Sequence, residues 1–80
     1  MHRIPIHVRA DFRLDGNIIP LVYIEPKGKT CTIQKVHRAY RDAEDRHMWI
    51  FDCLVIDSGN SIGIRLLFSG EQWYLCSREL

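Results

Sequence analysis

Four histidines and three cysteines are the side chains most capable of chemistry in this chain. A zinc site typically needs close pairs such as CxxC or HxxxH. The cysteines lie more than twenty residues apart, and His2 and His7 have opposite parity on a strand. The sequence therefore predicts no metal site and no cofactor. The residues considered are His2, His7, His37, His47, Cys31, Cys53 and Cys76.

A cysteine paired with a histidine is the one arrangement in this set that resembles a catalytic pair. Cys31 or Cys53 with His37 could form a nucleophile and its base. Nothing in the sequence positions an oxyanion hole, and the chain has no GxSxG, HExxH or glycine-rich phosphate loop. Each cysteine is better interpreted as a small buried hydrophobe, and three widely spaced thiols indicate a reducing, cytoplasmic setting. We therefore expect a protein that is not an enzyme.

Basic residues recur along the polar face of the first strand-like segment. Alternate residues of a strand lie about 7 Å apart, which matches the spacing of phosphates along a nucleic-acid backbone. Tyrosines elsewhere in the chain could stack on bases. However, the net charge is only +1 and Asp11 interrupts the basic series, so an ordinary solvated strand face is the simpler interpretation. Nucleic-acid binding is the alternative function, with Arg3, His7, Arg9, Arg13, Lys35 and Arg38 as its residues.

The densest apolar run, Met48–Ile56, points to an interaction surface instead. Trp49, Phe51, Cys53 and Val55 share one face of the expected strand and form its core half. The opposite face is also apolar except at Asp52, and such a surplus usually marks an interface. We expect this face to bind a second copy or another protein, unless the polar interval Ala39–His47 folds over it. The expected partner-binding residues are Met48, Ile50, Asp52, Leu54, Ile56 and Arg65, with Asp52 paired to Arg65 on the next strand.

Alternation of apolar and polar residues, interrupted by turn residues, defines the elements that carry these side chains. Pro5 and Pro20 indicate strand edges or bulges, and a bulge near Gln34-Lys35 would let Cys31, Ile33 and Val36 all face inward. Ala39–His47 is expected to be a loop with one turn of helix. The expected strands are Ile4–Arg13, Ile18–Glu25, Thr30–Arg38, Met48–Ile56, Ser61–Ser69 and Trp73–Arg78.

Eighty residues with 46% hydrophobic content are typical of one small soluble domain, here residues 1–80. No stretch reaches the ~20 apolar residues of a membrane span, and the amino terminus lacks the apolar segment of a signal peptide. Short strands in chain order predict an all-β fold. We expect a small SH3-like barrel of five or six antiparallel strands, mostly a meander, with an OB-like barrel as the alternative.

The chain contains the motif Phe12-x-x-Asp15-Gly16-x-Ile18-x-Pro20, then Ile33-x-x-Val36, and finally the late Trp73. These three short motifs resemble those of small bacterial β-barrel proteins of uncharacterised activity. The chain departs from that pattern at Pro26-Lys27-Gly28-Lys29, which interrupts the usual aromatic-rich strand before the second motif. The resemblance implies a fold class and a bacterial type of protein, and it implies no activity.

Overall fold

The computed structural model describes residues 2–77, and within that range it contains six strands and no helix. Accordingly, no helix in this range is long and apolar enough to cross a membrane. The predicted strand Trp73–Arg78 is present through Ser77, and Arg78 lies outside the described residues. The strands are β1 (His2–Phe12), β2 (Ile18–Ile24), β3 (Thr30–Arg41), β4 (Trp49–Asp57), β5 (Asn60–Phe68) and β6 (Trp73–Ser77).

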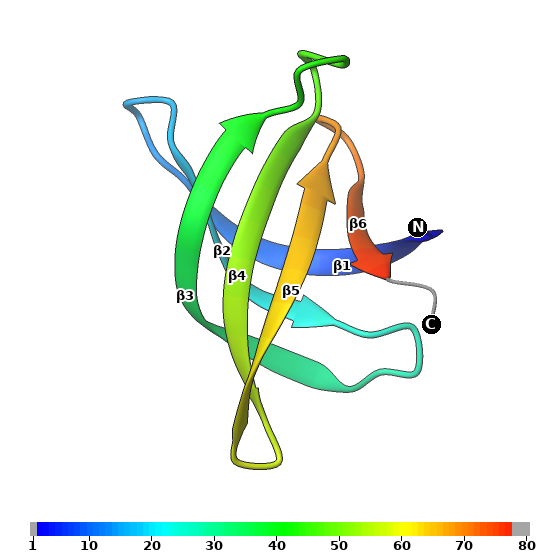
Figure 1. Ribbon diagram of the computed structural model, residues 1–80. Helices are drawn as coiled ribbons and strands as arrows, with labels where there is room; N and C mark the ends of the chain where they lie inside the picture. Colours follow the sequence, from blue (N-terminus) through cyan, green and yellow to red (C-terminus); the bar gives the residue numbers. More distant parts are fainter. Residues whose placement is uncertain (1, 78–80) are drawn as a thin grey trace.

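The strands form a closed antiparallel barrel in which each pairs with the next along the chain (Figure 1). β1 closes the barrel by pairing with β6 through residues 2–6 and with β2 through residues 7–12. β3 likewise pairs first with β2 and then, from Ile33 onward, with β4. The architecture is consistent with the predicted small SH3-like barrel of meander order.

Apolar side chains from all six strands fill the inside of the barrel. The predicted core half of β4 is confirmed, because Phe51, Cys53 and Val55 are buried and Trp49 packs against them. An aromatic series continues across the core: Phe51 packs on Trp73 at a centroid distance of 5.4 Å, and Trp73 on Phe68 at 4.5 Å. Such contacts add stability beyond the apolar area that they bury.

Both prolines lie where a missing backbone N–H is tolerated. Pro5 occupies the part of β1 that has only β6 as a neighbour. Pro20 pairs with Ala10 while Val22 pairs with Arg9, so Leu21 is the extra residue of a bulge. The predicted bulge in β3 is also present, since Ile33 pairs with Val55 and Lys35 with Leu54, which leaves Gln34 unpaired.

Residues 42–47 form a loop, as predicted for Ala39–His47, but the predicted start of the loop and its helical turn are wrong. β3 continues to Arg41, because Ala39 and Arg41 pair with Phe51 and Trp49 on β4, and this pairing outweighs local helix propensity. The remaining loop contains no helical turn. The carboxylates of Asp42 and Asp45 instead accept hydrogen bonds from backbone N–H groups two residues ahead, which stabilises turns in the loop.

Candidate functional site

The outer face of β4 lies in the middle of a five-stranded surface formed by β3, β4, β5, β6 and the start of β1. Strand register defines its rows, because directly paired residues point to the same side of a sheet. One row is apolar and aromatic and the next is mostly charged. The first row contains Tyr40, Ile50, Leu67, Tyr74 and Pro5; the second contains Arg38, Asp52, Arg65, Cys76 and Arg3; a third, shorter row contains Lys35, Leu54 and Gly63.

The predicted pair between Asp52 and Arg65 lies near the centre of this surface. Arg65 Nε donates to Asp52 Oδ1 at 2.7 Å, and the Tyr40 hydroxyl donates to Asp52 Oδ2 at 3.5 Å. The hydrogen bond to Asp52 is the main reason that the pKa of Arg65 lies above its usual value. The side chains are 24% and 41% exposed for Asp52 and Arg65, respectively, so solvent screens the pair only in part.

The chain itself covers one end of this apolar surface and leaves the other open. Met48 is buried, and its backbone exchanges hydrogen bonds with Asp42 and Asp45 of the preceding loop. Leu54 is half-buried, and Ile56, near the β4–β5 turn, is 49% exposed. Met48 is therefore inaccessible to a partner, whereas Ile56 is open to solvent and Leu54 is partly open.

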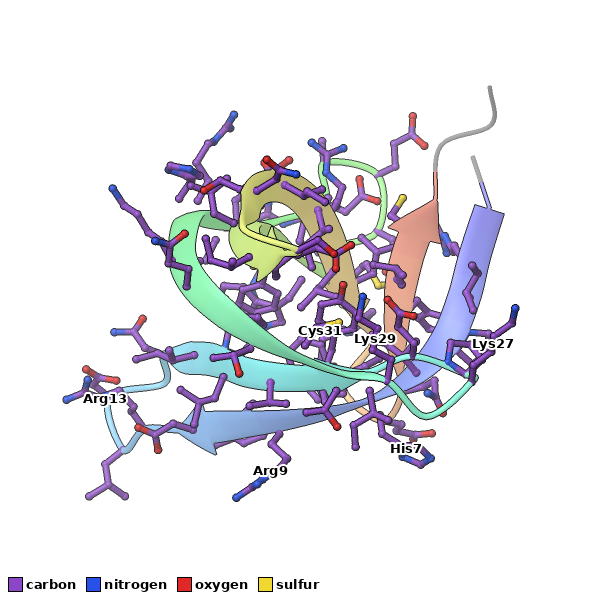
Figure 2. The ribbon with its side chains drawn as sticks, turned by 90° about the horizontal axis from the view of Figure 1, so that it is seen from below. His7, Arg9, Arg13, Lys27, Lys29 and Cys31 are labelled. Carbon is purple, nitrogen blue, oxygen red and sulfur yellow. The ribbon has the colours of Figure 1, made fainter. Side chains whose placement is uncertain are left out.

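The basic residues of β1 do line up on its outer side. Arg3, His7 and Arg9 are all exposed, as Arg13 is in the following turn. Seen from below the barrel, His7, Arg9 and Arg13 lie along β1 (Figure 2). Their neighbours on β2 are aliphatic, since His7 pairs with Ile24 and Arg9 with Val22.

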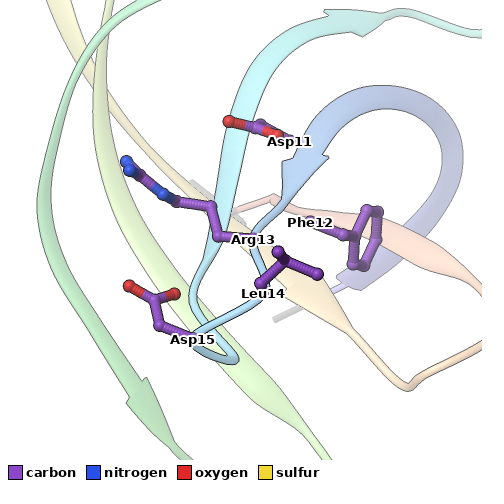
Figure 3. Close-up of a pocket in the computed structure, with 5 residues that line it drawn as sticks. All are labelled: Asp11, Phe12, Arg13, Leu14 and Asp15. Atoms are coloured by element: carbon purple, nitrogen blue, oxygen red, sulfur yellow. The ribbon is translucent and has the colours of Figure 1, made fainter.

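Arg13 lies in a different electrostatic setting at the tip of the β1–β2 hairpin. It lines a shallow hollow together with Asp11 and Asp15, and Figure 3 shows the three charged side chains on the same side of the hairpin. The Asp15 carboxylate accepts hydrogen bonds from the backbone and side-chain amides of Asn17. Two carboxylates beside Arg13 weaken the attraction of this tip for phosphate.

Lys35 and Arg38 do not extend the basic series of β1, contrary to the expectation from the sequence. Lys35 pairs with Leu54 and Arg38 with Asp52, which places both on the outer face shared with β4. The guanidinium of Arg38 lies 4.7 Å from the centre of the Tyr40 ring. The sequence could not show this, because two register shifts in β3 set the side on which each residue lies.

The two cysteines considered as candidate nucleophiles, Cys31 and Cys53, are unsuited to that role. Cys31 and Cys53 are buried, and burial raises the pKa of the Cys53 thiol to about 12. A nucleophilic cysteine needs an accessible thiolate, which is the opposite arrangement. Within residues 2–77, no three His, Cys, Asp or Glu side chains lie close enough together to hold a metal ion.

Sequence reasoning missed three members of the outer face: Tyr40, Leu67 and Tyr74. Tyr40 was missed because its segment was expected to be a loop. Leu67 and Tyr74 could have been found from the sequence, because alternation along each strand places them on its outward side. The exposed side chains Phe12, Leu14 and Leu21 on the β1–β2 hairpin were also missed.

Searches of protein-family models, of curated proteins and of solved structures found no match to this chain.

Proposed function

We propose that the protein is a non-catalytic interaction module that binds a protein partner, either another protein or a second copy of itself, through the outer face of β4. The observation that carries this proposal is the uncovered apolar end of that face, where Ile56 is 49% exposed and Leu54 is half-buried. An aliphatic surface of this kind, next to the Asp52–Arg65 pair, offers the mixture of apolar and polar contacts found in protein interfaces. The three free thiols support a reducing, cytoplasmic setting.

Site-specific photo-crosslinking tests this proposal in the cells that make the protein. A photoreactive amino acid is placed at Ile56, and in a control variant at Lys27, which is exposed in the β2–β3 turn and belongs to none of the three rows of the face. We expect a crosslinked adduct at position 56 that Leu54→Lys abolishes, and none at position 27. Adducts of equal yield at both positions, or none at Ile56, would contradict the proposal.

Light scattering coupled to size exclusion tests whether the partner is a second copy. If the chain self-associates through this face, a dimer forms at tens of micromolar and Ile50→Lys dissociates it. A monomer that Ile50→Lys leaves unchanged excludes the second copy and leaves another protein as the partner.

Nucleic-acid binding stays the second candidate, because Arg3, His7 and Arg9 are exposed along one strand. A fluorescence anisotropy titration with single- and double-stranded oligonucleotides at low salt tests it. Binding through this strand should weaken with added salt and with Arg9→Ala, since phosphate contacts release counterions. Absence of binding at low salt would eliminate this function.

A further inference from the structure

The outer face of β4 carries an excess of positive charge. Three of its basic residues, Arg3, Lys35 and Arg38, were assigned from the sequence to the alternative nucleic-acid site. Among the described residues, register places four basic side chains and one acidic side chain in the three rows of this face, a net charge of +3 (4 − 1). The complete chain has a net charge of only +1. The four basic residues are Arg3, Lys35, Arg38 and Arg65, and the acid is Asp52.

The acid is already engaged within the chain. Asp52 accepts from Arg65 Nε at 2.7 Å and from the Tyr40 hydroxyl at 3.5 Å. Lys35 and Arg38 are exposed and form no ion pair with any residue in the range 2–77. Arg38 also lies over the Tyr40 ring, which keeps its planar donor group held against the surface.

The basic side chains lie beside the aliphatic residues of this face. Adjacent strands are spaced by about 4.8 Å, so Arg3 on β1 and Arg38 on β3 lie about 19 Å apart along the sheet, at opposite ends of one row. Asp52, Arg65 and Cys76 lie between them in that row, and Ile50 and Leu54 flank Asp52 along β4. Lys35 pairs directly with Leu54, so a basic side chain borders the partly exposed aliphatic end of β4.

From this layout we infer that the face binds an acidic protein partner, one that presents carboxylates beside an apolar patch. The inference rests on the proposed function and adds the chemistry of the partner. The carboxylates would contact Lys35 and Arg38, and the apolar patch would cover Leu54 and Ile56. Complementary charges at a rim mainly raise the association rate and select the partner.

A second copy fits this face less well than an acidic partner. A two-fold axis near its centre brings the charged row against itself, so basic side chains of two copies face each other. The acids of the 42–48 loop lie beyond Tyr40 and Ile50, at one end of the face.

Nucleic acid also fits this face less well. The middle row of the face contains the Asp52 carboxylate, which repels phosphate. One face of the Tyr40 ring is occupied by Arg38 and is not open for stacking on a base.

Selection from a displayed library of random twelve-residue peptides tests the inference on the intact protein. Peptides are selected on the wild type and counter-selected against the neutral variant Ile56→Ser, so that only those dependent on this face are kept. We expect them to be acidic and to contain apolar residues, and to bind more weakly as salt rises. Their affinity should fall about tenfold in the double variant Lys35→Glu/Arg38→Glu.

Two further variants serve as controls. Lys27→Glu has the same charge change as Lys35→Glu but lies off the face, and it should leave affinity unchanged. The milder Lys35→Gln/Arg38→Gln, whose fold is checked by circular dichroism, should lose less affinity than the charge reversal.

The remaining outcomes separate the inference from the proposed function. Peptides that depend on Ile56 but are neutral or basic, and that bind the reversed variant normally, overturn the acidic partner and leave the docking face intact. A library that yields no peptide dependent on Ile56 counts against the docking face itself. Oligonucleotides that bind through Lys35 and Arg38 overturn the choice of a protein partner.

Discussion

Asp52 occupies an outward position on β4 that is flanked along the strand by Ile50 and Leu54, and Arg65 on β5 holds its carboxylate at 2.7 Å. We expect a double-mutant cycle with Asp52→Asn and Arg65→Gln to give a coupling of about 0.2–1 kcal/mol in urea unfolding. The pair therefore orients side chains on the face more than it stabilises the fold.

The ion pair between Lys29 and Asp57 is a matched control for this cycle. It has the same 2.7 Å separation, but its side chains are more exposed, at 53% and 40%. Because solvent screens the Lys29–Asp57 pair more strongly, its coupling free energy should be smaller than that of Asp52 and Arg65. A control coupling equal to or larger than that of Asp52 and Arg65 would show that partial burial does not strengthen the central pair.

Cys53 makes stability dependent on alkaline pH. Burial raises its pKa from 9.0 to about 12, so between these values the unfolded chain releases a proton that the folded chain keeps. The free energy of unfolding should therefore be fully retained below pH 9 and fall towards pH 12, by at most about 1.4 kcal/mol per pH unit from this group. Burial also raises the pKa of Tyr23, which adds to the fall above its usual value of 10.

Urea unfolding between pH 9 and 10 measures the contribution of Cys53 before Tyr23 takes part. Cys53→Ala lowers stability at every pH by leaving a small cavity, but it should make the dependence on pH shallower in this interval. An identical slope in the wild type and in Cys53→Ala would assign the alkaline loss to another group.

At the scale of elements, alternation and turn residues were sufficient to predict the strands, the β3 bulge and the inward half of β4. These features depend on side-chain types within one segment, so a single sequence contains them. The end of β3 was not predictable in this way, because Ala39–Arg41 is extended only through its pairing with β4. The candidate face was predicted in part: its β4 residues follow from parity, whereas the positions of Lys35 and Arg38 depend on bulges and cross-strand register.

The β4–β5 hairpin, which supports Ile56, contains a residue that is poorly suited to its backbone conformation. Ser58 has φ 51° and Gly59 has φ 81°, the two positive values of a type I′ turn. Asparagine tolerates the first position better than serine, so Ser58→Asn should raise the free energy of unfolding by about 0.5 kcal/mol. Thermal or urea unfolding measures the gain, and Ser61→Asn, in the adjacent strand, should give none. A gain at Ser61 as large as at Ser58 would rule out turn conformation as the cause.

For the whole molecule, barrel closure brings together charges that are separated along the sequence. Residues 1–41 contain eight Lys or Arg and three acids, whereas residues 42–80 contain three and seven. Pairing of β3 and β1 with the strands of the second half places Lys35 and Arg38 next to β4, and Arg3 next to β6, on the same outer face. The positive outer face is therefore a property of the closed barrel and of neither half alone.

The same closure separates the residues that stabilise the fold from those available to a partner. A chain of this length has a total stability of roughly 4–12 kcal/mol, so the single core has little stability to spare. Trp73 is buried where β6 meets β1, and it packs on Phe68 and Phe51. Trp73→Ala should therefore cost about 3–5 kcal/mol in urea unfolding, a large share of the total.

Ile56→Ala should change stability by less than about 0.5 kcal/mol, because the side chain is half exposed and lies outside the core. The contrast with Trp73 is a direct test of whether the face is free for binding. If Ile56→Ala proved as costly as Trp73→Ala, the isoleucine would belong to the packing of the barrel, and the apolar surface would have a structural explanation. A small cost at Ile56 combined with weaker binding of the selected peptides by Ile56→Ala instead assigns this side chain to binding.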